Sequence, residues 1–168
     1  DLIQEKHGYT KLLFYGGSHG GYLGAMLTSQ YPSLFSKAIL VNPVIAMWAN
    51  CVAADINDYV WHNLGLEYDY NGPTQSDLDL MWSRSPKLQP HSSPSAPQTS
   101  TLIMVGGKDE RVPARCNGVA WWGWLRRAGV PVECLWFAEG NHGLAGTPEM
   151  ERDVRSADVH TMASCSLD

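Results

Sequence analysis

Four short apolar segments occur along the chain, and helical stretches separate the first from the second and the third from the fourth. Each segment is rich in leucine, β-branched or aromatic residues and ends at a turn that contains glycine, proline or asparagine. The segments span residues 11–15, 38–41, 101–105 and 132–137. This alternation predicts a parallel sheet covered by helices, so we expect one α/β unit that extends over residues 1–168.

Helical patterns account for much of the chain between the predicted strands. Residues 42–90 are expected to hold two or three short helices, including one at 76–83, and a polar loop follows at 90–100. The helix before the last strand is predicted to begin at Pro113 and to end at Gly129. Its buried face is predicted to consist of Trp121, Trp122, Leu125 and Ala128. A further helical pattern near the C-terminus includes Met150, Val154, Ala157 and Thr161.

The composition is that of an ordinary globular protein and argues against several classes of partner. Hydrophobic residues make up 44% and charged residues 17% of the chain, and the formal net charge is -5. We expect no nucleic-acid partner, because binding a phosphate backbone requires a basic surface. No apolar run approaches the roughly 18 to 20 residues needed to cross a bilayer. Residues 1–10 also lack a signal-peptide pattern, so we predict a cytoplasmic protein with no membrane partner.

The cysteines do not indicate a metal site. They show neither a CxxC pair nor a Cys/His spacing that could close around an ion, and the chain is too long to depend on disulfides. The four residues are Cys51, Cys116, Cys134 and Cys165. We expect them to be reduced, with Cys134 in the core, and we expect no metal or cofactor.

A serine lies at the junction between the first predicted strand and the helix that follows it. The sequence GGSHG at 16–20 fits the G-x-S-x-G pattern, in which a serine is held on a sharp turn between a strand and a helix. The apolar segment at 11–15 runs directly into this pattern, and residues 20–30 leave it as a helix. One face of that helix is predicted to carry Leu23, Met26 and Leu27. This context predicts that Ser18 is a nucleophile.

Small residues around the serine support the same interpretation. A strained turn needs small neighbours, and a helix that packs closely on a sheet needs small residues at its start. The candidates for these two demands are Gly16, Gly20, Gly21 and Gly24. His19 is expected to shape the turn, and its backbone N–H is expected to donate to the oxyanion.

A nucleophilic serine needs a base, and the base needs a carboxylate to hold its tautomer. His142 follows the fourth predicted strand in EGNHG, at the end of the sheet where parallel strands present functional loops. Asp109 and its neighbour Glu110 both lie in the loop after the third strand. The chain order serine, acid, histidine is that of the α/β-hydrolases. We therefore predict an α/β-hydrolase fold with Ser18, Asp109 or Glu110, and His142 as its catalytic triad.

Several further motifs give the chain a family resemblance over nearly its whole length. They are GGSHGG at 16–21, QYP at 30–32, NPVI at 42–45, DINDY at 55–59, SP at 85–86, GGKDERVP at 106–113 and VPV at 130–132. With these motifs the chain resembles the prolyl oligopeptidase family of serine peptidases, and within it the acylaminoacyl-peptidases. The spacing in that family selects Asp109 over Glu110.

The resemblance implies a substrate and a reaction. It implies release of an N-acylated amino acid from the amino end of a short peptide through an acyl-enzyme, with such a peptide as the partner. It also leaves room for a homo-oligomer of the complete protein. Two alternatives remain open: a dipeptidyl or prolyl oligopeptidase or a carboxylesterase of the same fold, and a catalytically inactive relic or interaction module.

The chain departs from the family pattern in three places. Animal acylaminoacyl-peptidases have an arginine before the Asn-Pro pair, where this chain has Val41, and the approach to the third strand at 90–100 is unlike theirs. The family's β-propeller and the His-Gly-Gly loop that precedes its nucleophile are both missing from these 168 residues. We therefore expect an incomplete α/β-hydrolase that lacks N-terminal strands, as a fragment, a truncated gene model or a relic. Such an isolated chain is expected to be weak or inactive.

Overall fold

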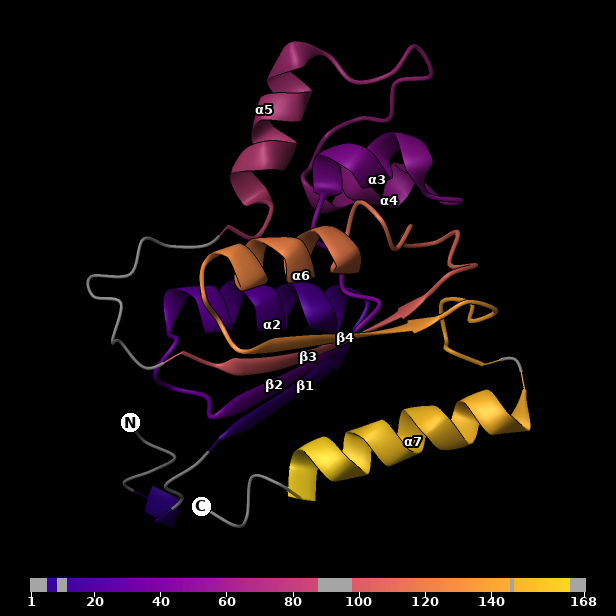
Figure 1. The fold of residues 1–168 in the computed structure, drawn as a ribbon. Coiled ribbons are helices and arrows are strands. Elements are labelled where there is room, and N and C mark those ends of the chain that lie inside the picture. Colours follow the sequence, from indigo (N-terminus) through magenta and orange to yellow (C-terminus); the bar gives the residue numbers. More distant parts are fainter. Residues whose placement is uncertain (1–5, 9–11, 88–97, 146, 164–168) are drawn as a thin grey trace.

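The fold is built on a sheet of parallel strands in sequence order. A computed structural model describes residues 6–8, 12–87, 98–145 and 147–163. The strands are β1 (Leu13–Gly17), β2 (Lys37–Val41), β3 (Ser100–Gly106) and β4 (Val132–Phe137), and the sheet has the order β1-β2-β3-β4. Every neighbouring pair is parallel (Figure 1), so all four strands end at the same edge of the sheet. This confirms the predicted parallel α/β architecture.

Helices cover both faces of the sheet. They are α2 (His19–Gln30), α3 (Met47–Ala53), α4 (Asp58–Asn63), α5 (Gln75–Arg84), α6 (Gly118–Arg127) and α7 (Pro148–Ala163). In Figure 1, α2 and α6 lie on one face and α7 on the other, while α3, α4 and α5 form a separate group beyond α2 and α6. The three short helices predicted within 42–90 are therefore confirmed. Of the predicted loop at 90–100, residues 90–97 lie outside the described part of the chain, and Ser100 opens β3.

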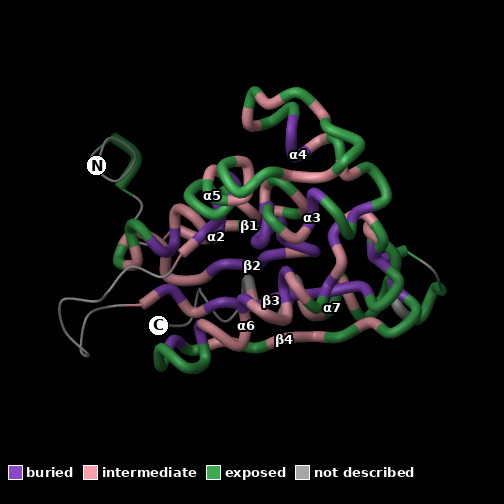
Figure 2. Tube along the Cα trace, turned by 90° about the horizontal axis from the view of Figure 1, so that it is seen from above, coloured by how far each residue is buried: buried purple, intermediate pink, exposed green. Residues whose placement is uncertain are grey.

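The central strands are buried and the outer strands are not. Every residue of β3 after Ser100 is buried, as are the three middle residues of β2, whereas β1 and β4 contain only half-buried and exposed residues (Figure 2). The ring of Tyr15 on β1 is 51% exposed. The first predicted strand therefore lies at an edge of the described sheet.

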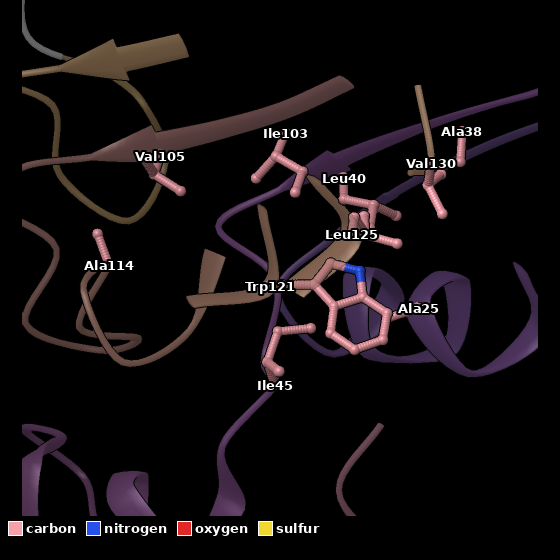
Figure 3. Packing of buried hydrophobic residues seen from close by; sticks show 10 residues of the cluster. All are labelled: Ala25, Ala38, Leu40, Ile45, Ile103, Val105, Ala114, Trp121, Leu125 and Val130. Carbon is pink, nitrogen blue, oxygen red and sulfur yellow. The ribbon is translucent and has the colours of Figure 1, made fainter. Parts of the chain in front are cut away.

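The principal core lies between the sheet and the pair α2 and α6. Its centre is Trp121, which is fully buried and is surrounded in Figure 3 by side chains from strands and helices. The cluster comprises Ala25, Ala38, Leu40, Ile45, Ile103, Val105, Ala114, Trp121, Leu125 and Val130. A second cluster joins α7 to the opposite face of the sheet through Val154 and Ala157. A third holds α3, α4 and α5 together around Trp61 and Met81.

The structure corrects the predicted bounds and face of α6. The helix begins at Gly118, five residues after Pro113, because Ala114 to Asn117 form turns in which the Asn117 side chain bonds to neighbouring backbone. Trp121 and Leu125 are buried as predicted, and Trp122 packs against the core with part of its ring exposed. Ala128 is exposed, so its predicted burial is wrong. At that position the helix has already ended, and Gly129 adopts a φ of 78°.

The apolar stripe predicted on α2 is not the buried face of that helix. Leu23 is 48% exposed, and Met26 and Leu27 are only half-buried. The residues that face the sheet are small: Gly21, Gly24, Ala25, Thr28 and Ser29. Close approach of the helix to the sheet outweighs the burial of larger apolar side chains.

Three cysteines lie in the described part of the chain, and none of them forms a disulfide. Cys134 is half-buried beside the main cluster, so the prediction that it lies in the core holds only in part. Burial raises the pKa values of the Cys51, Cys116 and Cys134 thiols above their usual range. Cys165 and the side chain of Met150 fall outside the described residues.

Two adjacent glycines in α2 provide a test of the close packing of this helix against its neighbours. A Cβ on Gly21 would lie 2.7 Å from the Cα of Pro43, whereas a Cβ on Gly20 would meet nothing within 4 Å. Gly21→Ala is therefore expected to reduce the free energy of unfolding by about 1–3 kcal/mol, the usual cost of overpacking. Gly20→Ala is expected to cost nothing, since alanine has the higher helix propensity. Urea unfolding of both variants makes the comparison, and equal effects at the two positions would contradict it.

Candidate active site

Ser18 occupies a strained turn between β1 and α2. Its φ of 54° and ψ of -119° lie outside the regions that non-glycine residues usually adopt. Backbone hydrogen bonds hold this conformation, because the Ser18 N–H donates to Val41 O at 2.8 Å and its carbonyl accepts from Tyr22 at 3.1 Å and from Val44 at 3.2 Å. A conformation of this kind costs about 1–3 kcal/mol and persists only where its surroundings enforce it. The turn thus has the geometry expected of a nucleophile elbow.

The glycines flanking the serine are not equivalent. A Cβ on Gly16 would lie 2.7 Å from the backbone of Gly20 and 2.8 Å from the ring of Phe14, so the close turn excludes any larger residue there. Gly20 differs, because a Cβ at that position would point into open space. The predicted steric need for glycine therefore holds at Gly16 and not at Gly20, whose carbonyl group is what a Cβ on Gly16 would meet.

Asp109 is buried in the loop after β3 and is fully hydrogen-bonded. Its side chain is 0% exposed. One carboxylate oxygen, Oδ1, accepts from the backbone N–H groups of Arg111 and Val112, both at 2.9 Å. The other, Oδ2, lies 2.8 Å from Nδ1 of His142. Glu110, the alternative carboxylate, is exposed and does not make this contact.

His142 lies in the loop after β4, opposite the acid. Asn141 shapes this loop through its side-chain oxygen, which accepts from Gly143 N at 3.0 Å and from Ala145 N at 3.2 Å. Because Nδ1 of His142 pairs with Asp109, Nε2 is the ring nitrogen left for proton exchange with another group. The His142 side chain is 31% exposed, so that nitrogen can be reached from outside.

Ser18 and His142 line the same cleft, whose volume is about 370 Å³. The other lining residues are His19, Val44, Ile56, Tyr59, Asn63, Arg111 and Val112. No hydrogen bond joins Ser18 Oγ to His142 within the described part of the chain. The fold thus brings all three predicted triad positions to one edge of the sheet and directly pairs two of them.

His19 is the first residue of α2 and also lines the cleft. The first N–H groups of a helix have no acceptor inside the helix, and the positive end of the helix dipole favours negative charge nearby. The His19 ring packs against Tyr22, with the ring centroids 5.2 Å apart. Its backbone N–H therefore belongs to the first turn of α2, whose N–H groups have no acceptor within the helix.

An ion pair at the rim of the cleft was not predicted from the sequence. Arg111 donates from Nε to Oδ1 of Asp55 at 2.6 Å and from Nη2 to Oδ2 at 3.1 Å. The guanidinium holds the pKa of Asp55 below its usual value. Both residues belong to quoted motifs, DINDY and GGKDERVP, but only the fold shows that these motifs meet.

Tyr59 is a second cleft residue that the sequence did not single out. Its hydroxyl is buried and has no hydrogen-bond partner among the described residues. Burial raises its pKa from the usual 10.0 to about 12. The phenol therefore stays neutral in the folded protein at pH values at which an unfolded chain would ionise it.

This shift predicts an alkaline effect on stability. Between about pH 10 and about pH 12 the unfolded chain loses the Tyr59 proton and the folded chain keeps it, so folding stability falls as the pH rises. Tyr59→Phe is expected to remove this part of the decline and, because it deletes an unpaired buried hydroxyl, to leave neutral-pH stability undiminished. Absorbance titration of tyrosinate with parallel urea unfolding measures both effects. An unchanged titration component near pH 12 in Tyr59→Phe would contradict the prediction.

The described part of the chain shows neither a metal-binding group nor a helix that could span a membrane. Across 6–8, 12–87, 98–145 and 147–163, no group of three histidine, cysteine, aspartate or glutamate side chains is arranged to hold a metal ion. In the same ranges, none of the helices combines the length and apolar character that a membrane span requires.

Comparison with known proteins assigns the chain to a family. The sequence profile described as "Prolyl oligopeptidase family" matches residues 2–160. The chain belongs to this family.

This prolyl oligopeptidase family member has curated relatives in animals and plants. It is 32% identical over 145 residues to the acylamino-acid-releasing enzyme of Rattus norvegicus. The matched region makes up 86% of this chain and 19% of that relative. It is 35% identical over 135 residues to the acylamino-acid-releasing enzyme of Arabidopsis thaliana. That matched region makes up 80% of this chain and 17% of the relative. The chain spans about a fifth of the length of the curated relatives it matches.

A solved structure shows the same fold. The acylaminoacyl peptidase in complex with Z-Gly-Gly-Phe-chloromethyl ketone superposes with a TM-score of 0.69 at 19% identity, covering 89% of this chain and 24% of that one. The predicted partial α/β-hydrolase fold is thereby confirmed for this member of the prolyl oligopeptidase family. At this identity the likeness is evidence for the fold alone.

Proposed function

We propose that the complete protein is a serine peptidase that releases an N-acylated amino acid from the amino end of a short peptide. Ser18 is the proposed nucleophile, His142 the general base and Asp109 the acid that orients it. The observation that carries this proposal is the 2.8 Å contact between His142 Nδ1 and Asp109 Oδ2 in the cleft that Ser18 lines. The names of the curated relatives support the choice of substrate.

The geometry suits an acyl-transfer cycle. Nε2 of His142 would take the Ser18 proton as Oγ forms a bond to the substrate carbonyl, and the same nitrogen would then protonate the leaving amine. Water would next attack the acyl-enzyme, with His142 again as base, to release the acyl-amino acid. Asp109 stabilises the transient imidazolium from a buried position where its charge is little screened.

The negative oxygen formed at the carbonyl requires hydrogen-bond donors. The His19 N–H at the start of α2 is the proposed first donor. One such donor contributes on the order of 2.7–4 kcal/mol, or about 10²–10³-fold in rate. The second donor is proposed to come from a part of the protein beyond these 168 residues.

Apolar side chains line the cleft beside the serine. Val44, Ile56 and Val112 form this lining, and the Tyr59 ring adds an aromatic surface. Such a lining would accept an uncharged acylated residue better than a free, charged amino terminus. We also propose a cytoplasmic location, supported by the free thiols of Cys51, Cys116 and Cys134.

Turnover of three substrates by the complete gene product tests the proposal. The substrates are an acetyl-alanine anilide, a glycyl-proline anilide and a short-chain nitrophenyl ester. We expect kcat/KM to be higher for the acetyl-alanine anilide than for the glycyl-proline anilide. Preference for glycyl-proline would indicate a dipeptidyl or prolyl oligopeptidase, and turnover of the ester alone would indicate a carboxylesterase. Failure of a fluorophosphonate probe to label Ser18 would favour an inactive relic.

A further inference from the structure

Asn42 occupies a buried and unusual position directly after β2. It is 2% exposed, and its φ of 41° lies in the left-handed region that asparagine tolerates better than most residues. Its backbone N–H donates to Met104 O at 2.8 Å, which extends the pairing of β2 with β3 by one residue. The residue therefore lies between the strand ends that lead to the proposed nucleophile and to the proposed acid.

The side-chain amide of Asn42 connects both catalytic loops. Its Oδ1 accepts from the N–H of Gly106 at 2.8 Å, at the start of the loop that carries Asp109. Its Nδ2 donates to the carbonyl of His142 at 2.8 Å and to that of Asn141 at 3.2 Å. Three of the four hydrogen bonds available to a primary amide are thus made by one buried side chain.

The contact with His142 is specific to this residue. The two loops also touch directly, because Lys108 N donates to Gly140 O at 2.8 Å and Lys108 forms an ion pair with Glu139. Those contacts lie at the base of the histidine loop. Within the described part of the chain, the bond from Asn42 is the one that reaches the backbone of His142 itself.

We propose that Asn42 is a positioning residue that sets the His142 ring against Asp109 by holding the backbone of His142. This inference rests on the proposed function for its kinetic consequence. Its physical basis is that a general base must keep its position relative to both its acid and its nucleophile. A displacement of about 1 Å can cost about 10²-fold in rate. The donor groups on Nδ2 are the essential feature, because a carbonyl oxygen accepts only from a donor.

Asn42→Gly is the primary test, because glycine tolerates the left-handed backbone while removing the amide. In the complete gene product we expect kcat to fall about 10²-fold with KM little changed. Asn42→Asp keeps an acceptor for Gly106 but cannot donate to His142, so it is expected to lose at least tenfold in kcat and provides a second variant if Asn42→Gly does not fold. Thr101→Val is the matched control, since it removes a buried hydroxyl bond at the opposite end of β3.

The split between kcat and KM separates positioning from a general loss of stability. A displaced general base slows the chemical step in folded molecules without weakening substrate binding, so kcat per folded molecule should fall in Asn42→Gly while KM stays near the parental value. A variant that is only less stable should keep the parental kcat per folded molecule, and Thr101→Val is expected to do so.

A spectroscopic measurement keeps this inference separate from the proposed function. The proton shared by His142 Nδ1 and Asp109 should give a far-downfield NMR resonance in the parent protein and in Thr101→Val, and the resonance should broaden or disappear in Asn42→Gly. If the parent protein shows no Ser18 labelling, the proposed function fails while this resonance still tests the positioning. A folded Asn42 variant with an unchanged resonance would overturn the inference. A parental kcat in the folded variant would overturn it equally.

Discussion

Ser18→Ala is expected to abolish covalent labelling by a fluorophosphonate probe and to lower kcat by about 10⁶-fold in the complete gene product. The reason is that alanine has no Oγ to form the acyl-enzyme, and among the residues that the structure describes no other hydroxyl is held on a strained turn in the cleft that His142 lines. The fold should persist, because the hydrogen bonds that hold the turn come from the backbone of residue 18.

The control for this variant is Ser83→Ala. Ser83 is exposed on α5, where its hydroxyl donates to Leu80 O and has no part in the cleft. Active-site labelling followed by peptide mapping should find the probe on Ser18 in both the parent protein and the control. Persistent labelling of Ser18→Ala at the parental rate would show that another residue is the nucleophile.

Asp109→Asn is expected to reduce kcat by about 10⁴-fold with little change in the fold. An asparagine can keep its oxygen toward the Arg111 and Val112 N–H groups, which are donors, and this orientation turns its NH₂ toward Nδ1 of His142. That nitrogen would then be an acceptor, so the wrong tautomer is favoured and the imidazolium loses its counter-charge.

Glu110→Gln provides the matched comparison. Glu110 is the next residue along the chain and carries the same charge, but it is exposed. Its replacement should leave kcat within about twofold of the parent, because screened surface charges have small effects. Stopped assays of both variants, with circular dichroism to confirm folding, decide the assignment. A loss in Glu110→Gln that matched that in Asp109→Asn would remove Asp109 from its proposed role.

The strands could be predicted because their signal is local. Val132 to Phe137 forms β4 with the predicted bounds, since a run of β-branched, apolar and aromatic residues between turn residues has few other stable conformations. The loops that carry Ser18, Asp109 and His142 could be predicted for a related reason. Each follows such a run directly, and parallel strands end at one edge of the sheet.

Predictions failed where packing between distant segments decides the outcome. The apolar stripe predicted on α2 is not the face that meets the sheet, because a close crossing over β1 and β2 admits only small residues, and Leu23 remains exposed. Gly20 was expected to be required by its contacts, yet its missing Cβ would meet nothing. Neither result follows from periodicity, which shows that a helix has a face without showing how near its neighbour lies.

The sequence alone determined the order of strands and helices, the strand-end loops with their serine, carboxylates and histidine, and the family to which these motifs point. The family spacing had already favoured Asp109 over Glu110, and the tertiary structure shows Asp109 in contact with His142. Only the tertiary structure decided that Arg111 pairs with Asp55 and that the amide of Asn42 joins two loops. The physical reason is range. Strand and turn preferences depend on neighbouring residues, whereas hydrogen bonds between loops depend on a sheet that brings residues 42, 106 and 142 together.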